Sequence, residues 1–323
     1  MISESVKNIL SSEEKKIATR TAYGDKLAEL GERNINIVAL DCDLSKSTMT
    51  ATFAKKFPER FFNMGIAEAN MMSVAAGLAA TGKIPFVSTF AVFATKRAAD
   101  QVSSSIAYPG MNVKICATHS GISVGEDGAT HQAIEDFAIM RAIPGITVLS
   151  PCDANETKSV IEAASEFFGP CYIRLSRSNV PAIFNENYKF KIGSGVKIMD
   201  GSAATLISTG FTVHIAFEAA KQLAQEGIEV DFINMPSIKP LDEDIVLSSA
   251  KKTGLVITVE DHSIIGGLGS AVCELLSEKM PVKVSRMGVN DKFGASGETY
   301  ELVKAYGFDS ESIVKNIKSL KGK

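Results

Sequence analysis

One acid stands out in the first half of the 323-residue chain. Between Arg60 and Lys83 the only ionisable side chain is Glu68, and small apolar residues follow it at positions 73–80. These surroundings predict a buried carboxyl group, and burial raises the pKa of a carboxyl group because it disfavours the charged form. Such an acid either costs stability or exchanges a proton or a hydrogen bond with a specific partner. Alternatively, Glu68 only begins a helix, where the helix dipole favours an acid.

A second polar group lies in segment 119–131, which reads His-Ser-Gly-Ile-Ser-Val-Gly-Glu-Asp-Gly-Ala-Thr-His and follows a predicted strand. Loops at the carboxyl ends of parallel strands are where α/β sheets bind ligands. The three glycines let the backbone approach a substrate closely. His119, His131, Glu126 and Asp127 supply donors and acceptors for a polyol. The alternative is a long solvated loop.

Two weaker motifs have structural explanations. Asp127-Gly128 and the later Asn155 superficially fit a GDG-then-N motif for a diphosphate and a metal ion, but Glu126 replaces the first glycine. Asn155 follows Asp153 at a predicted helix start, a role that needs no ligand. The run Gly-Gly-Leu-Gly at 266–269 matches a tight turn that begins a helix as well as it matches a nucleotide motif. We therefore expect no metal site within this chain.

Composition excludes several classes of protein. The chain has 34 basic and 37 acidic residues, a net charge of -3, and so offers no electrostatic basis for binding nucleic acid or an anionic membrane. Its five cysteines lack CxxC spacing, which argues against a zinc site or a disulfide framework and favours a reducing compartment. Neither a signal peptide nor an apolar run of membrane-spanning length is evident. We expect a cytoplasmic enzyme or assembly subunit.

The pattern of elements predicts an α/β fold with two domains, each a mostly parallel sheet covered by helices. Periodicity lapses across residues 176–196, so we expect the domains to span residues 1–185 and 186–323. The predicted strands are 37–40, 86–88, 113–118, 147–150 and 172–175, then 204–208, 229–233, 255–259 and 282–284. The predicted helices are 18–33, 67–81, 92–108, 132–142 and 154–168, then 213–226, 242–252, 267–278 and 298–306.

Seven short stretches, in order, match one enzyme family. They are Ala18-Thr19-Arg20, Asp43-Leu44-Ser45 with Ser47, Gly65-Ile66-Ala67-Glu68, Thr89-Phe90 with Phe93, the loop 119–131, Leu175-Ser176-Arg177 and Val259-Glu260-Asp261-His262. On these matches the chain resembles the C-terminal half of transketolases, from about residue 18 to its end. The resemblance implies a pyrimidine-binding domain followed by a transketolase C-terminal domain.

The resemblance also implies thiamine diphosphate as cofactor. Glu68 would be the catalytic acid that hydrogen-bonds to the aminopyrimidine ring, Phe90 and Phe93 would stack against that ring, and Ile66 would contact the cofactor. Without the resemblance, the two phenylalanines would be explained as well by ordinary core packing.

The same resemblance implies the substrate contacts and the chemistry. His131, with a catalytic role, and His119 would bind hydroxyl, carbonyl or phosphate groups, and Asp127 would select a hydroxyl configuration. Arg20, Arg177 and Ser47 would hold a sugar phosphate, with Asp43 as a further contact. The implied reaction transfers a two-carbon ketol unit from a ketose phosphate to an aldose phosphate, as in the pentose phosphate pathway.

Two departures from the family pattern are visible. Lys96 stands where many transketolases have a third aromatic residue, and Ala67 and Ala69 flank Glu68 where they have arginine and histidine. Both features resemble the shorter transketolases of animals and of two-subunit forms. Glu260, Asp261 and His262 would lie near a subunit interface.

The family's domain for the diphosphate and the metal ion has no counterpart in these residues. The resemblance therefore implies a split transketolase, in which an N-terminal-type subunit carrying the GDG-then-N motif shares the thiamine diphosphate and binds its Mg or Ca ion. We expect the two subunits to form a heterotetramer.

Three other functions fit parts of the pattern. The beta subunit of a 2-oxo-acid dehydrogenase has the same two-domain plan, but the loop 119–131 favours sugar phosphates. A synthase that joins decarboxylated pyruvate to glyceraldehyde 3-phosphate is a further possibility, weakened by the split architecture. A non-catalytic scaffold is disfavoured because Glu68, His119, Asp127, His131 and Arg177 are all present.

Overall fold

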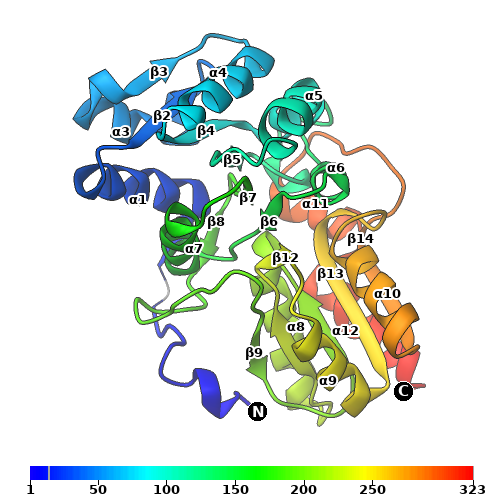
Figure 1. Cartoon of the computed structure of the whole chain (residues 1–323). Helices are drawn as coiled ribbons and strands as arrows, with labels where there is room; N and C mark the ends of the chain where they lie inside the picture. The colour runs from blue at the N-terminus through cyan, green and yellow to red at the C-terminus, as the bar shows by residue number, and fades with distance from the viewer. Residues whose placement is uncertain (14, 323) are drawn as a thin grey trace.

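The computed structural model describes residues 1–13 and 15–322, and it contains two large β-sheets, each with helices packed against it (Figure 1). This arrangement confirms the predicted α/β class.

The first sheet has seven strands in the order β12-β6-β7-β5-β4-β2-β3. All neighbours are parallel except β12, which runs antiparallel to β6. The strands are β2 (Ile37–Asp41), β3 (Phe61–Asn63), β4 (Ile84–Phe90), β5 (Lys114–Thr118), β6 (Thr147–Leu149), β7 (Cys171–Arg174) and β12 (Ser237–Lys239).

Helices cover both faces of this sheet. They are α1 (Thr19–Arg33), α2 (Ser45–Thr48), α3 (Ala51–Lys56), α4 (Glu68–Ala80), α5 (Ala99–Gln101), α6 (Asp136–Ala142) and α7 (Ala154–Glu166), with the π-helical turns η3 (Phe93–Arg97) and η4 (Val102–Ala107) and the 3₁₀ turns η2 (Pro58–Arg60) and η5 (Ile122–Val124). Ile37 and Ala39 pack in one hydrophobic cluster with α1, whereas Val38 and Leu40 pack in another with α4. Because successive strand residues point to opposite faces, burial of both faces explains the continuous apolar strands of the sequence.

The second sheet has five strands in the order β14-β13-β10-β11-β9, of which β9 is antiparallel to β11. Its strands are β9 (Val196–Met199), β10 (Thr205–Ser208), β11 (Asp231–Asn234), β13 (Leu255–Ser263) and β14 (Lys283–Val289). The accompanying helices are η6 (Gly210–Thr212), α8 (Val213–Gln225), α9 (Glu243–Thr253), α10 (Leu268–Lys279), α11 (Thr299–Ala305) and α12 (Ser310–Lys321).

The two halves of the chain are joined by more than the connecting segment. Strand β12 comes after β11 in the sequence yet pairs with β6 of the first sheet. The chain start, with the turn η1 (Glu4–Val6), bonds to β9, where the Ser3 amide donates to the Ile198 carbonyl at 2.9 Å. A small antiparallel pair, β1 (Lys16–Ala18) with β8 (Asn179–Pro181), ties the start of α1 to the connecting segment.

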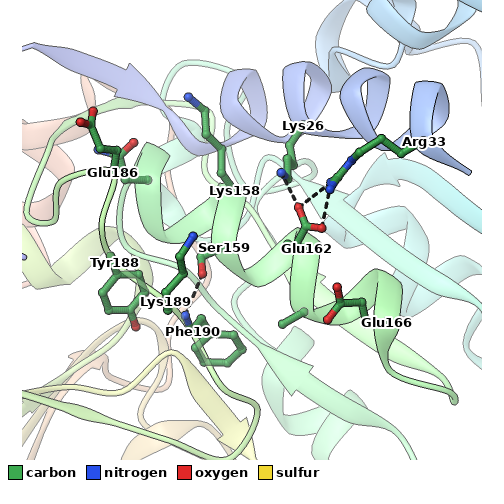
Figure 2. Close-up of a pocket in the computed structure, with 12 residues that line it drawn as sticks. Lys26, Arg33, Lys158, Ser159, Glu162, Glu166, Glu186, Tyr188, Lys189 and Phe190 are labelled. Carbon is green, nitrogen blue, oxygen red and sulfur yellow. Dashed lines mark hydrogen bonds and ion pairs between the residues drawn. The ribbon is translucent and has the colours of Figure 1, made fainter.

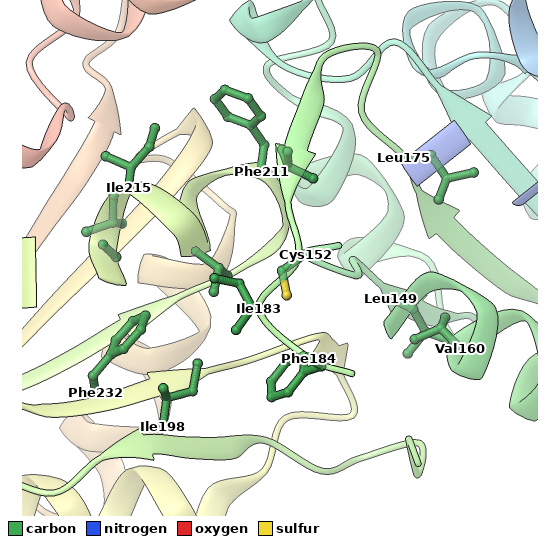
Figure 3. Close-up of a cluster of buried hydrophobic side chains, with 14 of the residues drawn as sticks. Leu149, Cys152, Val160, Leu175, Ile183, Phe184, Ile198, Phe211, Ile215 and Phe232 are labelled. Carbon is green, nitrogen blue, oxygen red and sulfur yellow. The ribbon is translucent and has the colours of Figure 1, made fainter. Parts of the chain in front are cut away.

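A shared hydrophobic core fills the junction. Leu149 and Val160 of the first half and Phe211 and Phe232 of the second belong to one hydrophobic cluster, and Figure 3 shows Phe184 of the connecting segment between Val160 and Phe232. All five side chains are buried. The division at residues 185 and 186 stays a prediction.

Several elements differ from expectation. The helix predicted at 132–142 begins only at Asp136, and the helix predicted at 92–108 is a short α-helix between two π-turns. The helix α12 and the strands β3, β9 and β12 were not predicted. Short strands give little periodic signal, and β12 exists only because the first sheet offers β6 as a partner. Asp153 caps α7 as expected, accepting the Glu156 amide at 2.7 Å. Among the described residues, no helix combines the length and apolar character needed to cross a membrane.

Glu156 is a buried acid at the junction. Its carboxylate accepts hydrogen bonds from the Cys152 amide, the Tyr188 hydroxyl and the Asn234 side-chain amide, each at 2.7 Å. Burial, followed by the nearby charge of Asp153, raises the pKa of Glu156 to about 7. Glu156 therefore connects α7, the connecting segment and β11, and the free-energy cost of burying its charged form depends on pH.

The first prediction concerns Glu156→Gln. The pKa of Glu156 is higher in the folded chain than its unfolded value near 4.5. Its contribution to stability is therefore fully present below about pH 4.5 and is lost as the pH rises through about 7. The free energy of unfolding of the variant should therefore gain on that of the wild type between pH 5 and pH 8, by about 1.4 kcal/mol for each unit of pKa shift. Urea titrations over this range measure the difference. Glu166→Gln, an exposed acid of the same helix, should leave the profile unchanged, and parallel wild-type and Glu156→Gln profiles would contradict the assignment.

Candidate functional site

The predicted site residues lie mainly at the carboxyl ends of the parallel strands of the first sheet. Asp43 and Ser47 follow β2, Phe90 ends β4, His119 follows β5 and Arg177 follows β7. Strands of a parallel sheet deliver their following loops to one edge, which is the usual ligand edge of such a sheet. The fold thus brings residues from distant parts of the sequence to one edge of the sheet.

Glu68 is buried as predicted, with 1% of its surface exposed. It is the first residue of α4, so the explanation as a helix-start acid also holds. One feature was not predicted: the Arg97 guanidinium donates from Nη1 to both carboxylate oxygens, at 3.0 and 3.1 Å. The nearby charge of Glu68 adds to the burial that raises the pKa of the Cys42 thiol to about 12.

Aromatic rings form a continuous group beside this acid. Phe90 and Phe93 are stacked with ring centroids 5.8 Å apart, and the imidazole of His119 stacks on Phe90 at 3.8 Å. His131 meets Phe93 edge-on at 5.6 Å. Four predicted site residues are therefore linked by a series of ring contacts, which is more than separate core packing of each phenylalanine would require.

A positively charged group lies next to the aromatic group. The Ser176 amide donates to the Thr19 hydroxyl at 2.8 Å, which brings the neighbouring Arg20 and Arg177 close together. Burial, followed by the charge of Arg177, lowers the pKa of Arg20. Burial and both arginines lower the pKa of His119 to about 3, so its imidazole is neutral at neutral pH.

Each arginine is anchored by a backbone carbonyl. Arg20 donates from Nη1 to the Ser47 carbonyl at 2.8 Å, and Arg177 donates from Nη1 to the Val124 carbonyl at 2.5 Å. Within residues 1–13 and 15–322, neither arginine forms an ion pair with an acid, and the Arg20 Nε is buried without a partner. Two adjacent guanidinium groups in this state suit an anion.

Asp41 shapes the loop that holds Ser47. Its carboxylate accepts from the Leu44 amide at 2.6 Å and from the hydroxyls of Thr48 and Thr50 at 2.6 and 3.0 Å. Asp43 adopts a left-handed conformation with φ 63° and is held by Asn63, whose side chain accepts from the Asp43 amide at 3.0 Å. This geometry matches a turn-forming role for Asp43.

Several predicted residues are accessible, among them the exposed Asp43. Ile66 is 78% exposed, Asp127 is exposed and His131 is half-buried. An isoleucine of that exposure beside a buried acid leaves an apolar surface available to a ligand or another chain.

A buried carboxylate of the second half fixes the loop 119–131. Asp261 accepts the amides of Ile122 and Ser123 at 2.8 and 3.3 Å. Arg174 donates to the Asp261 carbonyl at 2.8 Å and to the Asp136 carboxylate at 2.7 Å. Burial raises the pKa of Asp261 to about 6. The loop that carries His119 and Asp127 is thus held by the C-terminal half.

The acidic residues at the end of β13 are buried within this chain. Glu260, Asp261 and His262 are each at most 1% exposed, and the expectation that they lie near a subunit interface stays a prediction. Glu260 accepts the first amides of α10, from Leu268 and Gly269, at 2.7 and 2.8 Å. In the sequence, Glu260 and Asp261 appear as an acidic pair at the end of a strand, a pattern compatible with the chain interior and with a subunit interface.

A pocket of about 620 Å³ lies elsewhere, between α1, α7 and residues 186–190, and none of the predicted site residues lines it. Figure 2 shows Glu162 joined to both Lys26 and Arg33 within this pocket. Two of its cations are therefore already neutralised, and the pocket lacks the convergent groups found at the strand ends.

Comparison with known proteins decides the family. Residues 15–182 match the transketolase pyrimidine-binding domain, and residues 193–313 match the transketolase C-terminal domain. The chain belongs to the transketolase family. This confirms the resemblance seen in the sequence.

Its relatives include separate C-terminal chains of transketolase. The chain is 51% identical to a putative transketolase C-terminal section of Methanocaldococcus jannaschii, over 92% of this chain and 94% of that one. It is 43% identical to the 6-deoxy-6-sulfo-D-fructose transketolase subunit SqwH of a Clostridium species, over 92% of both. A solved structure titled as a split-gene transketolase, an inactive beta4 tetramer, superimposes with a TM-score of 0.86 and 49% identity, covering 94% of this chain and 98% of that chain.

The second prediction tests how the loop is held. Gly121 has φ +72°, and a Cβ there would lie 2.1 Å from the Asp261 carboxylate. Gly121→Ala should lower the free energy of unfolding by about 1–3 kcal/mol through backbone strain alone, with the steric clash adding to it. Gly77→Ala, in the interior of α4 with no atom within 4 Å of the new Cβ, should instead stabilise the chain by about 0.5–1 kcal/mol. Chemical denaturation measures both, and equal effects of the two substitutions would contradict a loop clamped by Asp261.

Proposed function

We propose that the chain is the C-terminal subunit of a two-chain transketolase. The assembled enzyme moves a two-carbon ketol unit from a ketose phosphate to an aldose phosphate. One observation carries the proposal: a fully buried carboxylate, Glu68, lies beside the stacked rings of Phe90 and Phe93 with the exposed Ile66 nearby.

The residues around Glu68 fit the aminopyrimidine ring of thiamine diphosphate, the cofactor that the family implies. A protonated carboxyl group donates a hydrogen bond to a ring nitrogen and, once the proton has moved to that nitrogen, the carboxylate accepts the bond; the phenylalanine rings offer flat apolar faces for stacking. Bound thiamine diphosphate would supply the electron sink for carbon–carbon bond cleavage. Glu68 would hold or release a proton at the pyrimidine ring, and its burial keeps water from competing for that proton.

The residues at the ends of β2, β5 and β7 fit a phosphorylated sugar. Arg20 and Arg177, with Ser47, would bind its phosphate, and Asp43 would lie at the edge of this group. The neutral imidazole of His119 can donate or accept a hydrogen bond at a hydroxyl or carbonyl group, and His131 and Asp127 are accessible for further contacts.

A companion chain completes the proposal. We propose that an N-terminal-type subunit binds the diphosphate and its Mg or Ca ion, and that two copies of each chain form a heterotetramer. Support comes from the relatives: one is a C-terminal section, another is named as a subunit, and the solved split-gene tetramer of beta chains is titled inactive. We also propose a cytoplasmic location, because the cysteines of the described residues are free thiols, as is typical of reducing compartments.

The rival functions receive less support. No matched relative reported above is a 2-oxo-acid dehydrogenase, a synthase or a scaffold protein, and the paired guanidinium groups suit a sugar phosphate better than a small 2-oxo acid. The donor and acceptor sugars stay open, since one relative is named for a sulfonated sugar.

Reconstitution with the companion chain tests the function. We expect the purified chain alone to be inactive, and the pair to transfer a ketol unit from xylulose 5-phosphate to ribose 5-phosphate or to a related acceptor. Activity of the isolated chain, or decarboxylation of 2-oxo acids by a pair that fails with every sugar phosphate, would contradict the proposal.

The third prediction concerns Glu68→Gln in the reconstituted pair. Loss of the proton-exchanging group should lower kcat by about 10²–10⁴ while assembly, followed by size-exclusion chromatography with light scattering, stays normal. Glu59→Gln, an exposed acid outside the site, should have wild-type activity. Full activity of Glu68→Gln would remove the catalytic assignment.

The fourth prediction concerns Arg20→Met. A hydrogen bond to a charged group contributes about 1.5–3 kcal/mol, so KM for a phosphorylated sugar should rise about tenfold or more. The KM for the same sugar without its phosphate should change little. The matched control is Arg33→Met at the other end of α1, which removes the same charge from an arginine paired with Glu162. Equal effects on both forms of the sugar would exclude Arg20 from phosphate binding.

A further inference from the structure

The ion pair between Arg97 and Glu68 joins two very different environments. The Glu68 side chain is 1% exposed, whereas the Arg97 side chain is 49% exposed. Both carboxylate oxygens receive the same donor nitrogen of Arg97, at 3.0 and 3.1 Å. A buried carboxylate without a partner is costly, so the arginine compensates a charge that the chain cannot hydrate.

Arg97 also covers an aromatic face. Its guanidinium carbon lies 4.2 Å from the centroid of the Phe93 ring, a geometry typical of a cation–π contact. The two residues are four apart on the π-helical turn η3, whose i→i+5 hydrogen bonds place residues four and five apart on one side. Lys96, the neighbouring cation, points to a different partner and pairs with Glu135 at 2.6 Å.

The guanidinium group of Arg97 therefore contacts both Glu68 and Phe93, two residues that we propose bind the aminopyrimidine ring. The guanidinium group is planar and donates hydrogen bonds, as a protonated aminopyrimidine ring would. It is also half-exposed and attached to a flexible side chain, so it can leave without unfolding its surroundings.

We propose that Arg97 occupies the place of the pyrimidine ring in the chain without cofactor, and that thiamine diphosphate binds by displacing its guanidinium from Glu68 and Phe93. This inference rests on the proposed function. Arg97 is then a residue that limits cofactor affinity while it protects the buried acid of a subunit awaiting its cofactor.

Cofactor affinity gives the main test. Isothermal titration of the reconstituted pair with thiamine diphosphate and Mg²⁺ is carried out for the wild type, Arg97→Met and Lys96→Met. Methionine keeps the apolar part of the side chain against Phe93 and removes the guanidinium. We expect Arg97→Met to bind thiamine diphosphate about two- to fivefold more tightly, the worth of a partly exposed ion pair. Lys96→Met removes the same charge from the next position, so it should bind no more tightly than the wild type.

The direction of the effect is diagnostic because loss of a positive charge ordinarily weakens binding of an anionic diphosphate. Unchanged or weaker binding by Arg97→Met would overturn the inference while leaving the proposed function intact. Absence of thiamine diphosphate binding to the wild-type pair would overturn the proposed function and this inference with it.

Stability of the isolated chain gives an independent test. Arg97→Met leaves Glu68 buried without its cation, so the melting temperature should fall by about 2–4 °C. Glu68→Gln removes the charge that needs compensation, and the double variant should therefore melt above Arg97→Met alone. Additive effects of the two substitutions would show that the pair does not exist in solution and would overturn the inference.

Discussion

A carboxylate withdrawn from water needs a partner, and the arrangement of the site follows from that constraint. Glu68 begins α4, where little of its surface is exposed. Because water cannot solvate the charge, the chain itself supplies a cation, and the π-turn that carries Phe93 also carries Arg97. The acid at the start of α4 is therefore paired with a cation from η3, the turn that follows β4 and also carries the ring of Phe93.

The C-terminal half contains a second buried acid, Asp261, that also needs partners within the protein. Asp261 has no access to water, and it is satisfied by the backbone amides of the loop that follows β5. The loop in turn keeps His119 stacked on Phe90. Arg174 donates to the Asp261 carbonyl and to the Asp136 carboxylate, so the two halves share one hydrogen-bonded network of charged side chains. The C-terminal half thus contributes no predicted substrate contact, yet it helps to fix the shape of the loop 119–131.

Much of the fold and the site could be predicted from the sequence, and the exceptions have physical reasons. Alternating apolar strands and amphipathic helices revealed the α/β class, and the isolation of Glu68 among apolar residues revealed its burial. Arg97 was missed because its contact with Phe93 and Glu68 depends on a π-turn, whereas Lys96 was noted because it stands where many transketolases have a third aromatic residue. The contact of Asp261 with the loop 119–131 was missed because only the tertiary fold brings the end of β13 next to that loop. Strand β12 was missed because it exists only through pairing with a distant strand.

In the proposed enzyme, Glu68 exchanges a proton with the pyrimidine ring of the cofactor. Nitrogen-15 NMR of thiamine diphosphate labelled in that ring, bound to the reconstituted pair, observes the exchange directly. We expect the ring nitrogen nearest Glu68 to show the chemical shift of a protonated or strongly hydrogen-bonded nitrogen in the wild type and to revert toward its free value in Glu68→Gln. Identical shifts in the two proteins would contradict the account.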